Sequence, residues 1–393
     1  MESRMVLEEA TLNKLRVNSP PGGWFPTLQD LYWCITESNL PCADLFLSPH
    51  LKRIRIYVSQ PRDNTFPLGP LPTLASIISA LPTSSLERMR VDDNYHIMLP
   101  WEHLKDSFSS VILRCGPSFT EYDSPVPLSD AAMDYLIHLP HLRTWRIRGP
   151  PPTYPTSSLP LVFPPLKKLI LGDGAACGWL PLLRRLEDGT STMQGVTPLS
   201  KAKESLKVLN VEDTLGINID PSFVSTIQCF RNLVHLYIDV HCPSEDDEGE
   251  CIFKLSDDNI TELAMVLTQL EFLLLGRACS ENTCLTTVAC LLPISVHCGK
   301  LERLEIHFNT TNIVNDFKNI LEDPRFQRLR SLSKCPLKCL DVYRMPLRLD
   351  ESDFETVAKG MVDIFPSLID CDGLEESWIE LSRQITDLQE GSE

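Results

Sequence analysis

The chain lacks any hydrophobic run long enough to cross a membrane. Its longest apolar stretch, over 263–275, is interrupted and falls short of the ~20 residues that a membrane-spanning helix needs. The first ten residues carry Glu2, Glu8 and Glu9 without an apolar core, so they do not match a secretory signal peptide. We therefore expect no membrane association and a location inside the cell, in the cytoplasm, in the nucleus or in both.

The chain also has fewer basic than acidic residues. The 393 residues include 36 Lys and Arg against 53 Asp and Glu, which gives a net charge of −17 at pH 7. The imbalance is concentrated in one part of the chain: residues 1–200 hold 18 basic and 19 acidic residues, whereas residues 201–393 hold 18 and 34. Because phosphates would be repelled by the second part, we expect no binding to nucleic acid.

Catalytic and cofactor motifs are missing too. Gly172 and Gly174 are not joined by the third glycine and the lysine of a phosphate-binding loop, and no Gly-x-Ser-x-Gly or His-Glu-x-x-His pattern occurs. The 14 cysteines show no zinc-ligand spacing, so we expect them to be reduced and mostly buried. We expect no catalytic residue, no cofactor and no metal ion, and therefore a non-enzymatic protein. A hydrolase or transferase is the remaining alternative.

The sequence does contain a recurring phrase: Leu, two residues, Leu or a substitute, one residue, and a branched apolar residue. Clear copies occupy Leu12–Val17, Leu51–Ile56, Leu142–Ile147, Leu166–Leu171, Leu206–Val211, Leu233–Ile238, Leu270–Leu275 and Leu301–Ile306. Looser copies begin at Leu28, Leu86, Phe108 and Leu337. The starts are on average about 30 residues apart, slightly more than in a regular leucine-rich repeat. The pattern predicts an irregular repeat array with insertions.

Each phrase has the alternation of a short strand, with the Leu and branched positions pointing inward. Helical patterns fill the intervals, after the capping residues Ser129, Ser256 and Asp350 and over 71–81 and 221–230. The cycle of strand, loop and helix predicts an α/β leucine-rich-repeat solenoid. Its parallel strands are expected to line a concave face, with the helices on the convex side.

The predicted organisation has three parts. Residues 1–23 form an N-terminal segment, interpreted as a degenerate first repeat; 24–376 form the solenoid, with 365–376 as a final half-repeat; and 377–393 form an acidic tail that frays. A proline-rich insertion covers 150–165, and an acidic one covers 244–250. Both are interpreted as solvated connectors, or alternatively as a docking loop and a phosphorylation site at Ser244.

The outward strand positions are the candidate binding residues, because they stack into ladders across a solenoid. They predict a face that is basic and aromatic early in the chain and acidic late. Arginine and tyrosine are favoured at binding hot spots, although outward positions that are merely solvated are an equal alternative. The candidate partner-binding residues are Arg55, Tyr57, Arg90, Arg114, Arg146, Arg148, Tyr237, Asp239, Glu305 and Asp341.

Several ordered phrases go beyond a generic repeat. They occupy Leu40–Leu51, Leu113–Ser118, Pro127–Ala132, Leu139–Trp145, Phe163–Leu166 and Gly178–Leu183. Together they resemble the expanded F-box/leucine-rich-repeat family of basidiomycete fungi, over roughly residues 24–376.

The resemblance implies the target-recognition part of an SCF-type ubiquitin ligase, in which an N-terminal F-box grips the adaptor and the repeats present a protein target. The SCF adaptor is therefore an expected partner. This chain departs from the family pattern because 1–23 contains no Leu-Pro phrase and is shorter than an F-box. The alternative is a free-standing interaction scaffold or decoy. Outside any complex the chain is expected to be a monomer, and its target is not named by the sequence.

Overall fold

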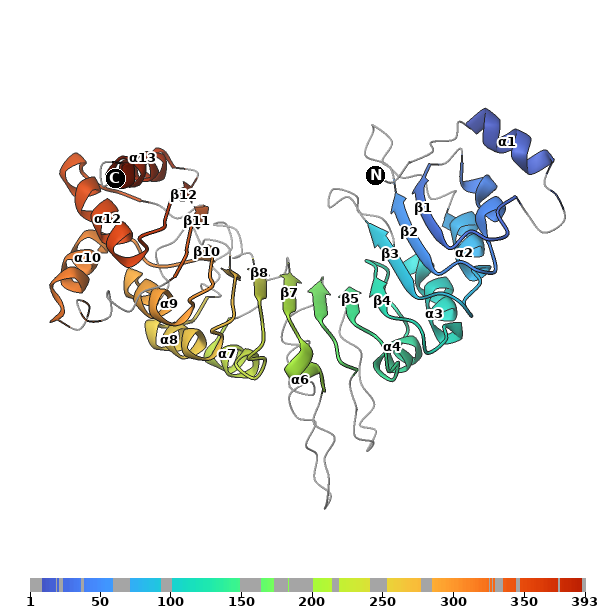
Figure 1. The fold of residues 1–393 in the computed structure, drawn as a ribbon, viewed down its shortest axis with the longest axis horizontal. Coiled ribbons are helices and arrows are strands. Elements are labelled where there is room, and N and C mark those ends of the chain that lie inside the picture. The colour runs from blue at the N-terminus through green and yellow to red at the C-terminus, as the bar shows by residue number, and fades with distance from the viewer. Residues whose placement is uncertain are drawn as a thin grey trace, which may run out of the picture. The chain divides into compact units, whose positions relative to one another are not determined.

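The computed structural model describes residues 9–18, 20, 24–36, 39–58, 71–92, 101–148, 164–172, 183, 201–213, 219–240, 253–276, 285–324, 326, 328, 335–343, 347–373 and 375–390. The chain divides into two compact units, residues 1–166 and 167–393, here called unit 1 and unit 2. Each unit is described by itself below, and Figure 1 labels the elements of both.

Unit 1 is built on parallel strands that follow one another in chain order. They are β1 (Asp30–Ile35), β2 (Arg53–Val58), β3 (Arg88–Asp92), β4 (Glu121–Asp123) and β5 (Thr144–Arg148). The helical segments are α1 (Glu9–Val17), η1 (Leu40–Phe46), α2 (Leu71–Ser79), η2 (Trp101–Leu104), α3 (Lys105–Arg114) and α4 (Asp130–Ile137). Helices α2, α3 and α4 lie on one side of the strands, and neighbouring helices contact each other (Figure 1).

Unit 2 repeats this plan. Its parallel strands, again in chain order, are β6 (Lys168–Gly172), β7 (Val208–Asp213), β8 (His235–Val240), β9 (Phe272–Leu275), β10 (Arg303–Ile306), β11 (Cys339–Tyr343) and β12 (Asp370–Gly373). Its helical segments are α6 (Lys201–Ser205), α7 (Pro221–Ile227), α8 (Asp257–Val266), η3 (Val288–Cys290), α9 (Leu291–His297), α10 (Ile313–Glu322), α12 (Glu351–Ile364) and α13 (Glu376–Glu390).

One backbone hydrogen bond recurs from repeat to repeat and fixes the register. The residue after the first leucine of each phrase donates its N–H to the carbonyl of its counterpart in the preceding repeat. In unit 1 Glu87 donates to Lys52 and Arg143 to Thr120, both at 2.7 Å; in unit 2 Lys338 donates to Glu302 at 2.9 Å. Since equivalent residues align, the phrase leucines stack into a continuous buried core, as Leu51, Leu86 and Leu142 do in unit 1.

These observations confirm the predicted fold, an α/β leucine-rich-repeat solenoid. Helices are found in all five segments where they were predicted. The Ser129 side chain caps α4 by accepting from the Ala132 N–H, and Ser256 forms a capping box with Asn259 at the start of α8.

Two of the predicted strand phrases are helical instead. The copy at Leu12 lies on α1, where Leu12 and Leu15 pack against the 3-10 helix η1 and Val17 is exposed. The copy at Phe108 lies on α3, which buries Phe108, Val111 and Ile112. Leucines three residues apart share one face of a helix, so this part of the phrase suits either element.

Two strands occur where no phrase was recognised as a full repeat. In the β4 repeat, Phe119, Tyr122 and Ser124 occupy the three inward positions, and all are buried. In the β12 repeat, Leu368 and Cys371 do so. A search that allows aromatic or small residues at the leucine positions, directly after Gly-Pro-Ser or Phe-Pro-Ser, would have found both.

The segment 377–393, predicted to be a fraying tail, is mostly helix. It forms the greater part of α13, which buries Trp378, Leu381 and Ile385. Its polar side chains face the strand beside it: Ser382 Oγ accepts from the Cys371 N–H at 3.2 Å, and Thr386 donates to the Ile369 carbonyl at 3.4 Å. The helix therefore covers β12 and shields backbone groups that an open edge would expose.

The predicted proline-rich insertion lies outside the described residues except for 164–165, and the acidic insertion with Ser244 lies wholly outside them. In the part of the chain that the structure describes, no helix is both long and apolar enough to cross a membrane.

Candidate binding surface

The candidate surface is the side of the strands that faces away from the helices, here called the open face of each unit. Strand alternation places every second side chain on it. In β3, for example, Met89 and Val91 are buried while Arg88, Arg90 and Asp92 are exposed or half-buried. The open face is thus lined by polar and aromatic side chains aligned across neighbouring strands.

The open face of unit 1 carries a row of aligned residues. Tyr32 on β1 pairs in register with Arg55 on β2, Arg55 with Arg90 on β3, and Arg90 with Asp123 on β4. The Arg55 guanidinium lies over the Tyr32 ring, 5.4 Å from its centroid, and makes a cation–π contact. Tyr57, also a candidate residue, is half-buried on β2 and aligns with Asp92.

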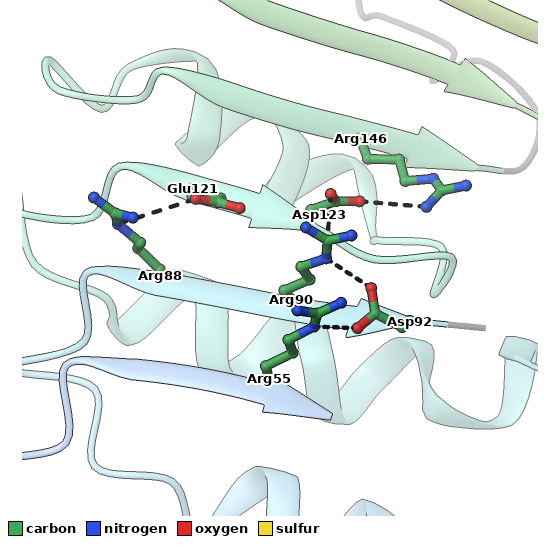
Figure 2. Close-up of polar contacts among 7 residues, drawn as sticks. All are labelled: Arg55, Arg88, Arg90, Asp92, Glu121, Asp123 and Arg146. Carbon is green, nitrogen blue, oxygen red and sulfur yellow. Dashed lines mark hydrogen bonds and ion pairs between the residues drawn. The ribbon is translucent and has the colours of Figure 1, made fainter. Parts of the chain in front are cut away.

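Figure 2 shows that the arginines of this row interleave with carboxylates. Asp92 accepts from Arg55 and also from Arg90, whose Nε lies 2.6 Å from Asp92 Oδ1. Asp123 lies between Arg90 and Arg146, with N–O distances of 3.8 Å and 3.4 Å. The arginines and carboxylates therefore form one continuous ion-pair network.

Burial differs along this network. The side chains of Arg146 and Asp123 are only 9% and 4% exposed, whereas that of Arg55 is 46% exposed. Burial acts to raise the pKa of Asp92, but the hydrogen bonds from Arg55 and Arg90 outweigh it and hold that pKa below its usual value. The network thus stabilises the charged form of Asp92.

A second row of ion pairs borders the first. Arg53 Nε lies 2.5 Å from Asp30 Oδ1, and Arg88 Nε lies 4.0 Å from Glu121 Oε2. Both arginines are about half-exposed, so these pairs contribute little to stability. The early part of the open face was predicted to be basic. The structure corrects this, because the arginines lie beside carboxylates from Asp30, Asp92 and the unrecognised strand β4.

The open face of unit 2 has a different character, centred on aromatic rings. Phe272 on β9 aligns with His235 on β8 and with Arg303 on β10. Its ring stacks with those of His235 and Tyr237 at centroid distances of 6.0 Å and 6.2 Å, and the Arg303 guanidinium lies 5.9 Å from its centroid. We call His235, Tyr237, Phe272 and Arg303 the aromatic patch.

Carboxylates surround the aromatic patch. Tyr237 donates from its hydroxyl to Asp239 at 2.9 Å, and Arg303 pairs with Asp341 at 3.1 Å. The acidic side chains on this face are Glu212, Asp239, Glu305, Asp341, Asp370 and Asp372. The basic ones among the described residues are Lys168 and Arg303, so the late part of the face is acidic, as the sequence predicted.

Of the candidate residues, Arg55, Tyr57, Arg90 and Arg146 lie together in unit 1, and Tyr237, Asp239, Glu305 and Asp341 lie on the strands of unit 2. Arg114 was predicted wrongly. It ends helix α3 and donates to the carbonyls of Ser110 and Ser79, because the phrase that placed it is helical. Arg148 ends β5, and its side chain is outside the described set.

Several residues on these faces were not predicted from the sequence. Glu121 and Asp123 were missed because β4 lacks leucine, whereas His235, Phe272 and Arg303 sit two residues earlier in their phrases than the outward positions that were considered. Outward position 307, also on the predicted ladder, holds His307, which is buried with 1% exposure.

The described residues contain no group of three or more His, Cys, Asp or Glu side chains arranged to hold a metal ion. Burial raises the pKa of the Cys115, Cys298 and Cys335 thiols to about 12, so these thiols are protonated at neutral pH and are poor nucleophiles. The open faces display paired charges, aromatic rings and hydrogen-bonding groups.

No protein-family model matches the chain, and no curated protein sequence matches it. Among solved structures, the chain is similar to the crystal structure of the Rad7 and Elc1 complex in yeast. The match has 13% sequence identity and a TM-score of 0.40, and it covers 93% of this chain and 81% of that one. A likeness at this level does not bear on function.

Proposed function

We propose that this chain is a non-enzymatic leucine-rich-repeat module that binds protein partners through its open faces. One observation carries the proposal: register-aligned Arg, Tyr, Phe and carboxylate side chains line the strands, while the helices occupy the opposite side. Tyrosine and arginine combine contact area with directional hydrogen bonds and are enriched at binding hot spots. The side chains therefore suit protein recognition.

The finer proposal is target recognition for an SCF-type ubiquitin ligase, supported by the ordered phrases that resemble the fungal F-box/leucine-rich-repeat family. Specificity would come from the open faces, while ubiquitin transfer would take place on other subunits, in the cytoplasm or the nucleus. The second candidate is a free-standing scaffold or decoy that uses the same open faces without any ligase subunit.

A matched pair of triple variants tests the binding role. The open-face variant carries Tyr32→Ala, Tyr237→Ala and Phe272→Ala. The control carries Leu113→Ala, Met265→Ala and Ile379→Ala, which remove exposed apolar side chains from helices α3, α8 and α13. Cross-linking in cell extract should yield partners that the open-face variant loses and the control retains. Equal capture by both variants, with both folded, would refute the proposal.

Co-purification with the SCF adaptor separates the two finer candidates, with an established F-box protein as positive control. Stoichiometric capture by this chain would support the ligase-receptor role. Failure to capture the adaptor, combined with partners that depend on the open face, would support the scaffold.

A further inference from the structure

The aromatic patch of unit 2 offers a site for an apolar anchor. Phe272 and Tyr237 are half-buried, with their rings nearly parallel, and Leu274, which follows Phe272 at the next outward position of β9, is buried beside them. Desolvating such rings against an apolar side chain is a large favourable contribution at protein interfaces. The anchor position therefore lies over β8 and β9.

Carboxylates lie on two sides of this position. Along β7 and β8, Glu212 and Asp239 align with each other just beyond Tyr237. Across the sheet, Glu305 aligns with Leu274 on one side and with Asp341 on the other, and Asp341 aligns with Asp372 on β12. The patch is thus an apolar centre with acidic flanks rather than an acidic cluster alone.

The spacing of the flanks sets the size of a ligand. Strands lie ~4.8 Å apart, so the acidic residues from β8 to β12 span about 19 Å. An extended chain advances ~3.3 Å per residue, so about six residues cover that distance. A short extended segment is long enough to place one side chain on the rings and others beside the carboxylates.

The charge balance identifies the flanking chemistry. Arg303, one of the two cations on the described part of this face, is already paired with Asp341 at 3.1 Å. An acidic segment would meet like charge on both flanks, which costs free energy and slows association, whereas a basic one would meet opposite charge. In unit 1, by contrast, Asp92 and Asp123 are each within ion-pair distance of two arginines.

We propose that the open face of unit 2 binds an extended segment of a partner protein in which an apolar or aromatic anchor is flanked by lysine or arginine side chains. The anchor packs on Tyr237 and Phe272, and the flanking cations pair with Glu305, Asp239 and Asp372. This inference rests on the proposed protein-binding function and names the chemistry of the bound segment.

The test is an unbiased selection with the full chain. A phage-displayed library of random peptides of about twelve residues, long enough to exceed the span of the acidic flanks, is selected at about 0.15 M salt, where the Debye length is ~8 Å and weak long-range attraction is screened. We expect the enriched peptides to share an aromatic or aliphatic centre between lysines or arginines.

Variants then locate the binding of one enriched peptide. Phe272→Ala should weaken it about tenfold, as expected for a hot-spot ring, and Glu305→Lys should weaken it several-fold more than Glu305→Gln. The controls lie on helix α8, where Met265→Ala and Glu262→Lys make the same kinds of change at exposed positions. The controls should leave affinity unchanged. Phe272→Leu provides a conservative second variant if Phe272→Ala fails to fold.

Enrichment of acidic or uncharged peptides, no enrichment, or equal weakening by the α8 controls would each overturn the proposal. These results are distinguishable from failure of the proposed function. If the triple open-face variant still loses its cross-linked partners, the face binds protein and only the basic character of the segment is wrong.

Discussion

The two units build the same kind of open face and use its charges differently. In unit 1, Arg55, Arg90 and Arg146 are tied to Asp92 and Asp123, and the most buried members are almost inaccessible to water. In unit 2, rings occupy the centre, and the half-exposed Arg303 lies beside them. The first face pairs its arginines with carboxylates, and the second combines aromatic rings with an excess of carboxylates.

A ladder of charged residues is therefore not in itself a binding surface. An arginine whose hydrogen bonds are already made to a buried carboxylate has to break them before it can bind a partner. The half-buried rings of Tyr237 and Phe272 can contact a partner without the breaking of an ion pair. This is why the aromatic patch, and not the arginine row, is the better candidate for partner capture.

The greatest predicted loss of stability lies in unit 2 and should leave unit 1 unaffected. Trp378→Ala removes a fully buried ring that packs α13 against β12, where the ring closely approaches Gly373. We expect a loss of about 3–5 kcal/mol in the free energy of unfolding. Amide hydrogen exchange should show the loss of protection in β11 and β12, with β2 and β3 unaffected. Ile379→Ala, at an exposed neighbouring position, is the control. A loss below about 1 kcal/mol for Trp378→Ala would contradict the role of α13 in covering β12.

The second prediction compares the stability cost of neutralising one carboxylate on each open face. Asp123→Asn removes the charge between Arg90 and the buried Arg146, and we expect it to cost about 3 kcal/mol. Asp341→Asn leaves Arg303, whose side chain is 51% exposed, to be solvated by water and should cost about 1 kcal/mol. Urea denaturation of both variants measures the difference. Equal costs would mean that the two faces do not differ in the way described.

A dependence of stability on pH between pH 7 and pH 5 is expected from His307 in unit 2. Burial lowers the pKa of His307 to about 4, from an ordinary value of 6.5, and an edge-on Phe253 ring lies 6.2 Å away. Below pH 6.5 His307 is protonated in the unfolded chain but stays neutral in the folded chain. The free energy of unfolding therefore falls as the pH drops from 6.5 towards 4. The loss between pH 7 and pH 5 should be about 2 kcal/mol.

Denaturation at several pH values tests this dependence. His307→Leu should abolish most of it, whereas His103→Leu, at an exposed position in unit 1, should leave it intact. An unchanged pH profile in His307→Leu would assign the effect to other groups.

The smallest predicted loss of stability is at Arg55, at the exposed end of the arginine network. Arg55→Gln breaks a pair whose arginine is 46% exposed and should cost about 0.5–1 kcal/mol, less at high salt. It should also raise the pKa of Asp92, because one of the hydrogen bonds that lower this pKa is lost. An NMR titration of the Asp92 carboxyl group measures this pKa shift. Arg53→Gln is the control, because Arg53 pairs with Asp30 and not with Asp92.

Much of the fold could be predicted from the sequence, because the residues that face the core carry the repeat pattern. Ten of the twelve phrase starts, from Leu28 to Leu337, precede a strand. The errors at Leu12 and Phe108 share one cause, since Leu-x-x-Leu fits a strand of this repeat and the face of a helix equally well. Helix ends were predictable where capping was local, as at Ser129 and Ser256.

The candidate surface was less predictable, because partners across strands lie far apart in the chain. Arg55 and Asp92 are 37 residues apart, and Arg303 and Asp341 are 38 apart. Missing the β4 repeat concealed Asp123, and with it the charge that pairs with Arg90 and Arg146. The unrecognised strand β4 supplies Glu121 and Asp123, while Asp30 and Asp92 come from strands that were recognised.

Local periodicity and composition were enough to predict the repeat, the inward leucines, the capped helices and the acidic balance of the second half. The folded chain was needed to show which charges neutralise one another, that α13 covers β12, and that His235, Tyr237, Phe272 and Arg303 form one patch. Those outcomes depend on the register between strands. The register is set by hydrogen bonds and side-chain packing between repeats about 30 residues apart, which no local pattern encodes.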